Sequence, residues 1–323
     1  MSHWNKIKKF FPIIGVALFI YLLIKLDITK VVGEIKNVNF SYLFIALIFV
    51  LIFFSIQTLK WFVIARKQKI NVPYWAAFKI NLICNFYGFI TPSKIGSVIR
   101  MDYLKKYGGD TGKGLSNFAI DKVLDLGSLF ILVVVFGFIF AQEKIISSTN
   151  LYILLSFFLL IFVAFLFFYK KENSKKALGF IYRKFVPKRL KEKGKTIFDS
   201  FYKDTPKKKF LFFVLFINLI NWIVDYAIIY FTGLSLGINI GFTPFLIILP
   251  LSTLVAQIPI TIDGLGTREL TMISLFALFN VEAVKVLSMS ILSIIIVNII
   301  PGIIAVILAL LEKNEIHNIN RSR

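Results

Sequence analysis

Long apolar runs limit this chain to folds that a lipid bilayer can hold. An α-helix needs about 20 residues to cross the hydrocarbon core of a membrane. Runs that meet or approach this length occupy 10–26, 40–62, 117–141, 151–169, 209–231 and 284–311. Because lipid offers backbone groups no hydrogen-bonding partner, the runs predict an all-α, polytopic integral membrane protein with about six full spans. The hydrophobic fraction of 58% agrees with that class.

Two segments rich in proline, glycine and charge interrupt shorter apolar stretches. The first, TPSKIGSVIR at 91–100, follows the apolar segment 77–91, and the second, IPITIDGLGTRE at 258–269, follows 244–258. Broken backbone at membrane depth persists only where protein or a polar cavity surrounds it. Paired interruptions in the two halves of a chain indicate a transport site near the middle of the bilayer.

The basic residues predict the orientation of the chain. Lysines precede the first apolar run, which places the N-terminus in the cytoplasm by the positive-inside tendency. If 77–91 crossed the membrane fully, the strongly basic stretch 170–209 would lie outside. If the chain instead turns back near Pro92, every basic loop and the C-terminal tail lie inside. The charge pattern therefore predicts a re-entrant hairpin at 77–116, with both termini in the cytoplasm of a cell-membrane protein.

The second interrupted segment belongs to a stretch, 244–281, that starts and ends outside under this topology. We interpret it as a hairpin that enters from the opposite side, so that the two hairpins form an inverted repeat. Two thin full spans are the alternative, and charge does not distinguish them. The whole chain, 1–323, is expected to form a single transmembrane domain.

The stretch 170–209 carries much of the net charge of +21. Its placement between apolar runs argues against nucleic acid as a partner. Part of it is amphipathic, since one helical face holds Leu190, Gly194, Ile197 and Phe201 and lysines occupy the others. This pattern predicts a helix on the anionic lipids of the cytoplasmic leaflet. A solvated connector that only fixes topology is the alternative.

The first interrupted segment has groups suited to an anion. Thr91 and Pro92 are typical of a helix N-cap and first helical residue, so we expect a helix that runs back through Arg100. Free N–H groups at a helix start attract phosphate. Arg100 could instead extend to the cytoplasmic interface. The candidate substrate-binding residues here are Pro92, Lys94, Gly96 and Arg100.

The second segment contains Arg268, whose guanidinium could hold a phosphate in a bidentate fork. Thr261 or Asp263 is expected to cap the returning helix. The alternative role for Arg268 is to pair with Asp263 or Glu269 and neutralise a buried charge. The candidate substrate-binding residues here are Pro259, Asp263, Gly264, Gly266, Arg268 and Glu269, where the glycines allow close backbone approach.

Asp121 and Asp225 lie within apolar runs. A carboxylate in a span is costly and usually faces the bundle interior or a water-filled path. We expect both aspartates to line a polar path, where each could carry a proton or pair with Arg100 or Arg268.

Catalytic and metal-binding patterns are missing from the sequence. Cys84 is the only cysteine, and both histidines lie in the terminal tails, so neither a disulfide framework nor a His/Cys metal site is expected. There is no GxSxG, P-loop or Asp-x-Asp motif. The sequence therefore predicts a non-enzymatic protein without a cofactor or metal.

Two blocks resemble the lysylphosphatidylglycerol synthase transmembrane, or flippase-like, family. TPSKIGSVIRMDYLKKYGG with the following AIDKVLDL is similar to its first signature, and LPLSTLVAQIPITIDGLGTREL to its second. The family commonly has Gly-Glu where this chain has Gly96-Ser97, and Glu-Arg where it has Asp121-Lys122. The second exchange keeps both charges.

This resemblance implies movement of a phospholipid or polyprenyl-linked glycolipid between leaflets. The related membrane domain of the bacterial multiple peptide resistance factor is joined to a soluble lysyltransferase. This sequence shows no such domain, so aminoacylation is not expected. Two alternatives stay open: a membrane glycosyltransferase that uses a polyprenyl-phosphate sugar, and a non-transporting scaffold whose basic loop recruits partners.

Overall fold

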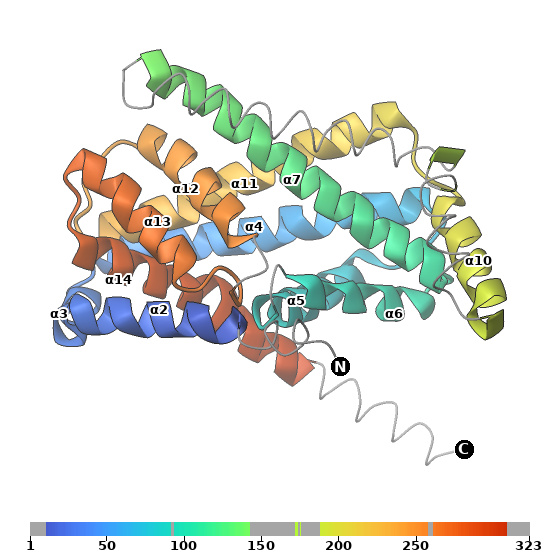
Figure 1. Ribbon diagram of the computed structural model, residues 1–323, viewed down its shortest axis with the longest axis horizontal. Helices are drawn as coiled ribbons and strands as arrows, with labels where there is room; N and C mark the ends of the chain where they lie inside the picture. The colour runs from blue at the N-terminus through green and yellow to red at the C-terminus, as the bar shows by residue number, and fades with distance from the viewer. Residues whose placement is uncertain are drawn as a thin grey trace. The chain divides into compact units, whose positions relative to one another are not determined.

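The computed structural model describes residues 11–91, 94–142, 172–173, 175, 188–257 and 261–308 (Figure 1). Within these residues every regular element is helical and no strand occurs, as expected for an all-α chain. The α-helices are α2 (Phe11–Lys25), α3 (Ile28–Lys36), α4 (Phe40–Lys67), α5 (Tyr74–Phe89), α6 (Arg100–Lys105), α7 (Thr111–Gln142), α10 (Lys188–Tyr202), α11 (Lys208–Ser235), α12 (Phe242–Ala256), α13 (Thr267–Phe276) and α14 (Ala283–Ile294). Two short 3₁₀ segments, η1 (Ile95–Ile99) and η2 (Ala277–Phe279), and the π-helical η3 (Ile295–Ile299) complete the order.

Four helices of the described ranges are long and apolar enough to cross a bilayer. They are Phe40–Lys67, Thr111–Ile139, Lys208–Ser235 and Ala283–Leu308. Each covers most of one predicted span, so the polytopic helical class is confirmed. The run at 10–26 forms the shorter α2, and the run at 151–169 lies outside the described residues.

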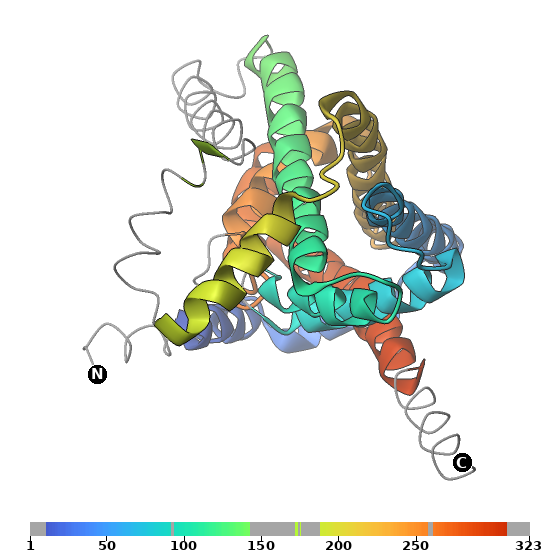
Figure 2. The same ribbon diagram turned by 90° about the vertical axis from the view of Figure 1, so that its right-hand side faces the viewer.

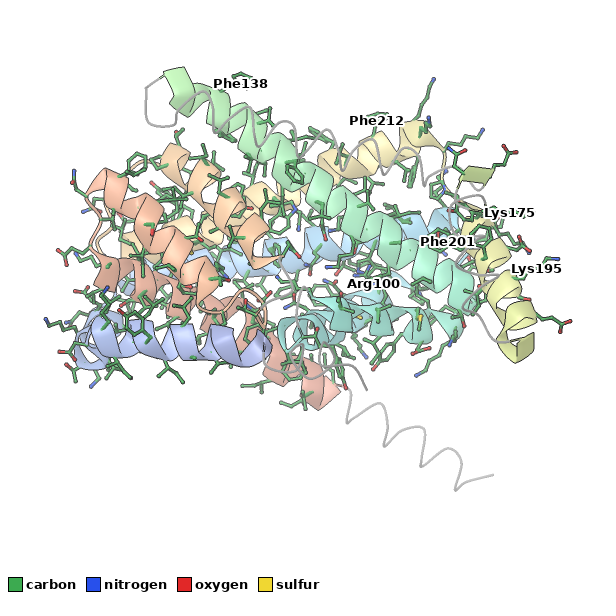
Figure 3. All side chains as sticks on the ribbon, in the orientation of Figure 1. Arg100, Phe138, Lys175, Lys195, Phe201 and Phe212 are labelled. Atoms are coloured by element: carbon green, nitrogen blue, oxygen red, sulfur yellow. The ribbon has the colours of Figure 1, made fainter. Side chains whose placement is uncertain are left out.

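The spans expose apolar side chains and bury polar ones. Phe44, Leu51 and Phe212 are each more than 60% exposed, and Figure 3 shows Phe212 and Phe138 on the outer surface of their helices. By contrast, the polar side chains of Lys60 in α4 and Asn218 in α11 are buried. A soluble protein rarely exposes so much contiguous apolar surface, whereas lipid covers it at no cost. The distribution is that of a membrane-embedded bundle.

By internal contacts, the chain divides into two compact units. Unit 1 comprises 1–58, 73–99 and 220–323, and unit 2 comprises 59–72 and 100–219. Unit 1 therefore contains both interrupted segments up to Ile99, and unit 2 contains α6, α7 and α10.

In unit 1, the short helices α5 and α12 are each followed by a limb that folds back against them. α5 contacts η1, and α12 contacts α13. A glycine permits each contact: a Cβ at Gly96 would collide with the carbonyl oxygen of Tyr87, and a Cβ at Gly264 would collide with Ala256. The close backbone approach expected of Gly264 is thus an approach between the two limbs of its own hairpin. Membrane re-entry and an inverted repeat remain predictions.

Helix α2 packs against the second hairpin through two more glycines. A Cβ at Gly15 would collide with Thr261, and a Cβ at Gly266 would collide with the carbonyl oxygen of Gly15. Nearby, Leu22 of α2, Val31 of α3 and Leu287 of α14 form one buried apolar cluster. The ribbon of this unit shows α2, α13 and α14 as neighbours (Figure 1).

In unit 2, α7 is the central helix, in contact with α6 and α10. Its apolar residues Ile120 and Leu124 form a buried cluster with Ile64, Leu211 and Val214. Figure 2 shows α10 crossing the N-terminal part of α7.

Candidate functional site

Thr91 joins the end of α5 to the start of the return limb. Its hydroxyl oxygen lies 2.9 Å from the carbonyl oxygen of Tyr87 and 3.0 Å from that of Gly88, and it accepts the N–H of Gly96 at 2.7 Å. Thr91 therefore satisfies backbone groups on both sides of the break. That matters because free polar groups are costly away from water.

The expected helix from Pro92 through Arg100 is wrong in its first half. Lys94 has a φ of +56°, which is incompatible with a right-handed helix. The limb then forms the 3₁₀ segment η1, and α-helix begins only at Arg100. Pro92 itself lies outside the described residues.

Gly266, rather than Thr261 or Asp263, caps α13, so that expectation is wrong. Gly266 has a φ of +84°, which glycine adopts without steric cost. The Glu269 carboxylate accepts the Gly266 N–H at 2.6 Å and the Ser290 hydroxyl at 2.7 Å. Both carboxylate oxygens of this buried side chain thus serve the structure of the hairpin.

An ion pair joins the two interrupted segments. The Lys94 ammonium lies 3.4 Å from a carboxylate oxygen of Asp263. Both residues have positive φ, +56° for Lys94 and +46° for Asp263. Non-glycine residues rarely hold this conformation, and where they do, surrounding contacts enforce it, often at functional sites. The two motifs of the sequence therefore meet through their charged turn residues.

Arg268 and Asp225 complete a group of four charged side chains in unit 1. Arg268 is half-buried at the start of α13, and among the described residues it has no ion-pair partner within 4.0 Å. The two carboxylates named above as alternative ion-pair partners of Arg268 have other contacts. Asp263 pairs with Lys94, and Glu269 accepts the N–H of Gly266. Asp225 of α11 interacts electrostatically with Lys94, Arg268 and Asp263. We call these four residues, Lys94, Asp225, Asp263 and Arg268, the hairpin cluster.

A second charged group lies inside unit 2. Arg100 donates to Asp121 at 2.8 Å, and its guanidinium lies 4.6 Å from the centre of the Trp61 ring. Lys60 lies 3.0 Å from Asp121 and 2.6 Å from Asp125. We call Lys60, Arg100, Asp121 and Asp125 the buried ion network.

The network decides between two readings of Arg100. Its side chain is only 5% exposed, so the alternative that it extends to the membrane interface is wrong. The pairing of Arg100 with Asp121, one of the roles expected for that aspartate, is observed.

Sequence reasoning missed Lys60. It lies near the end of the apolar run 40–62, where a lysine usually reaches the interface and attracts no attention. The useful signal was the pair of aspartates at helical spacing in the run 117–141, because two buried carboxylates need cationic partners from another helix.

The predicted site residues thus fall into groups. The hairpin cluster contains Lys94, Asp225, Asp263 and Arg268. The buried ion network contains Arg100 and Asp121. Gly96, Gly264, Gly266 and Glu269 shape the hairpins, while Pro92 and Pro259 lie outside the described residues. Contact of any of them with a substrate stays a prediction. Within the described ranges, no three His, Cys, Asp or Glu side chains gather as a metal site requires.

The basic helix α10 packs on α7 rather than standing alone. A Cβ at Gly112 of α7 would collide with Ser200 and with the carbonyl oxygen of Ile197, and the Ser200 hydroxyl donates to Asp110. Lys195 of this helix is exposed and points outward (Figure 3). Of the predicted apolar face, Ile197 and Phe201 are half-buried. Binding of anionic lipid by 170–209 stays a prediction.

Asp204, just after α10, is expected to stabilise the position of this helix, and this stabilisation should depend on pH. Hydrogen bonds from Lys69 (2.8 Å) and Lys113 (2.9 Å) lower the pKa of Asp204 from 3.8 to about 2. The folded protein therefore favours the charged form, so the stabilisation is complete above pH 3.8 and is lost as the pH falls toward 2. Asp204→Asn should lower the melting temperature at pH 6, and the difference from wild type should shrink at pH 3. A difference that is constant over this range would contradict the assignment.

The chain is similar to known proteins over most of its length. The family model described as lysylphosphatidylglycerol synthase TM region matches residues 12–305. A "UPF0104 membrane protein" of Methanothermobacter thermautotrophicus is 21% identical over 296 residues, which cover 86% of this chain and 85% of that protein. The family match includes both interrupted segments and three described spans in full, and it ends within the fourth, Ala283–Leu308.

Proposed function

The chain belongs to the lysylphosphatidylglycerol synthase TM region family, and from that premise we propose that it moves a phosphate-containing lipid between the leaflets of the cell membrane. The observation that carries the proposal is the hairpin cluster. It combines charged turn residues from both interrupted segments with a half-buried arginine that has no ion-pair partner among the described residues.

Arg268 is the group that binds the lipid phosphate in this proposal. A guanidinium offers a planar fork of donors that matches two phosphate oxygens. Its position at the first turn of α13 adds the favourable field of a helix N-terminus. Lys94 supplies a second cation when its pair with Asp263 rearranges. The acyl or prenyl tails stay in lipid while the headgroup passes along the protein.

Asp225 and Asp263 have a different part in the proposal. They balance the charge of Lys94 and Arg268 when no lipid is bound, which lowers the cost of holding two cations away from water. Anionic phosphate then replaces a carboxylate as the partner of a cation. This exchange keeps binding weak enough for release.

The proposed topology places both termini in the cytoplasm, where the basic stretch 170–209 contacts anionic lipid. The protein acts on lipid position and not on covalent bonds, so neither a cofactor nor a donor sugar takes part.

Purified protein in vesicles of phosphatidylethanolamine and phosphatidylglycerol tests the proposal. A phospholipid with a fluorescent headgroup is placed in both leaflets, and a membrane-impermeant quencher reports the fraction that reaches the outside. Wild-type protein is expected to expose inner-leaflet probe well above the rate of protein-free vesicles. A polyprenyl-phosphate-linked probe in a parallel assay distinguishes the two lipid classes.

Failure with both probes in correctly folded protein would contradict the proposal. Mass spectrometry of lipid that co-purifies with the protein gives an independent result: phosphate-containing lipid should be enriched over the host membrane. Release of a sugar or of a diphosphate product from the polyprenyl probe would instead support a glycosyltransferase.

A further inference from the structure

Lys60 places its ammonium inside a cage of oxygen atoms. The nitrogen lies 3.0 Å from Oδ1 of Asp121, 2.6 Å from Oδ1 of Asp125 and 3.0 Å from Oδ1 of Asn218. The Lys60 side chain is 2% exposed. Carboxylate and amide oxygens at these distances are the ligands that hard cations prefer in proteins.

Neighbouring groups hold the cage oxygens in place. Asn218 donates through its Nδ2 to the Ser128 hydroxyl at 3.0 Å, which directs its oxygen toward Lys60. Arg100 donates to Oδ2 of Asp121 at 2.8 Å, so Oδ1 of the same carboxylate faces Lys60. Outer contacts of this kind orient the ligands of ion sites.

Two other cationic side chains lie beside the cage, Lys122 and Arg100, and neither fills it. Lys122 lies 3.9 Å from Oδ2 of Asp125, the oxygen that does not bind Lys60, and its side chain is 28% exposed. Of the two carboxylate oxygens of Asp121, Arg100 pairs with Oδ2, the one that does not face Lys60. Among the described residues, the Lys60 ammonium is the cation that occupies the position shared by the three oxygens.

We propose that these three oxygens form a monovalent-cation site whose occupant is a side chain of the protein itself. The Lys60 ammonium takes the place that a dissociable sodium or potassium ion would hold. Its charge balances the two carboxylates together with Arg100, and its covalent stem removes any need to capture an ion from solution. The wild-type site is therefore permanently filled and insensitive to the alkali cations around it.

This inference concerns ion binding and does not depend on the proposed lipid transport. For the transporter it means that the network in unit 2 functions without a sodium or potassium gradient. The two ideas fail separately, because the experiment below measures thermal stability and not lipid movement.

The test uses full-length protein with Lys60→Met, which keeps an unbranched stem but removes the ammonium. The three cage oxygens then lack a cation. Sodium or potassium chloride should raise the melting temperature of this variant by several degrees over choline chloride at equal ionic strength, because a bound ion stabilises only the folded state. Wild type and Lys67→Met, a change at an exposed lysine of the same helix, should melt at the same temperature in all three salts.

A second variant separates ion binding from general salt effects. Lys60→Met combined with Asp125→Asn removes one carboxylate of the cage and one negative charge, so its response to sodium and potassium should disappear. The proposal is overturned if Lys60→Met melts equally in all salts, if it is not recovered folded in any of them, or if the double variant responds as strongly as the single one.

Discussion

Arg268→Ala should slow lipid translocation in reconstituted vesicles by roughly 10- to 100-fold. A hydrogen-bonded contact to a charged group contributes about 1.5–3 kcal/mol, and each 1.36 kcal/mol corresponds to a factor of about ten in rate. Arg268 is half-buried and has no ion-pair partner among the described residues. Its removal therefore takes away the proposed phosphate contact and breaks no ion pair among the described residues.

Two variants make this measurement specific. Arg268→Lys keeps the charge but loses the bidentate fork, so we expect a rate between those of wild type and Arg268→Ala. Arg66→Ala removes an exposed arginine at the end of α4 and should translocate lipid like wild type. Full transport by well-folded Arg268→Ala would remove Arg268 from the mechanism.

Asp121→Asn should destabilise the protein by about 3–5 kcal/mol, the usual cost of breaking a buried ion pair from one side. Asp121 binds both cations of the buried ion network, at 3.0 Å from Lys60 and 2.8 Å from Arg100. Its neutralisation leaves Arg100 buried without its carboxylate partner. Unfolding in mixed micelles with increasing denaturing detergent measures the change.

Asp102→Asn is the matched control for Asp121→Asn. Asp102 pairs with Lys105 at 2.6 Å on α6, but both side chains are exposed, at 54% and 43%. An exposed pair contributes only about 0.2–1 kcal/mol. Equal losses in the two variants would show that the buried network has no special weight in stability.

The long spans could be predicted from sequence because hydropathy is a local property. The described helices α4, α7, α11 and α14 each coincide with an apolar run, since lipid imposes helix on any such run. The two breaks could also be located, because proline and glycine mark them.

The geometry inside the breaks could not be predicted. Thr261 and Asp263 are better caps than glycine by residue type, yet Gly266 caps α13 because only glycine accepts a φ of +84° without cost. Nothing in the local sequence indicates that Lys94 and Asp263 share a left-handed conformation.

The sequence predicts only in part which charged residues, far apart along the chain, form ion pairs with each other. The pairing of Arg100 with Asp121 could be expected, because each residue carries a charge that membrane burial makes costly, whereas the pairing of Lys94 with Asp263 was not expected. The choice of partner depends on which helices are neighbours. One sequence does not contain that information, so it does not predict Lys60, and the alternative pairing of Arg268 with Asp263 or Glu269 is not observed among the described residues.

The contact of α2 with the second hairpin has a consequence for biogenesis. Gly15 and Gly266 are separated by most of the polypeptide, and each would clash with its neighbours if it carried a Cβ. The ribosome therefore delivers α2 long before its partner exists, and lipid must cover that face in the interval. Gly15 and Gly266 can come into contact only after α13 has been synthesised. Final assembly of this unit is thus a late event, which follows membrane insertion of the earlier spans.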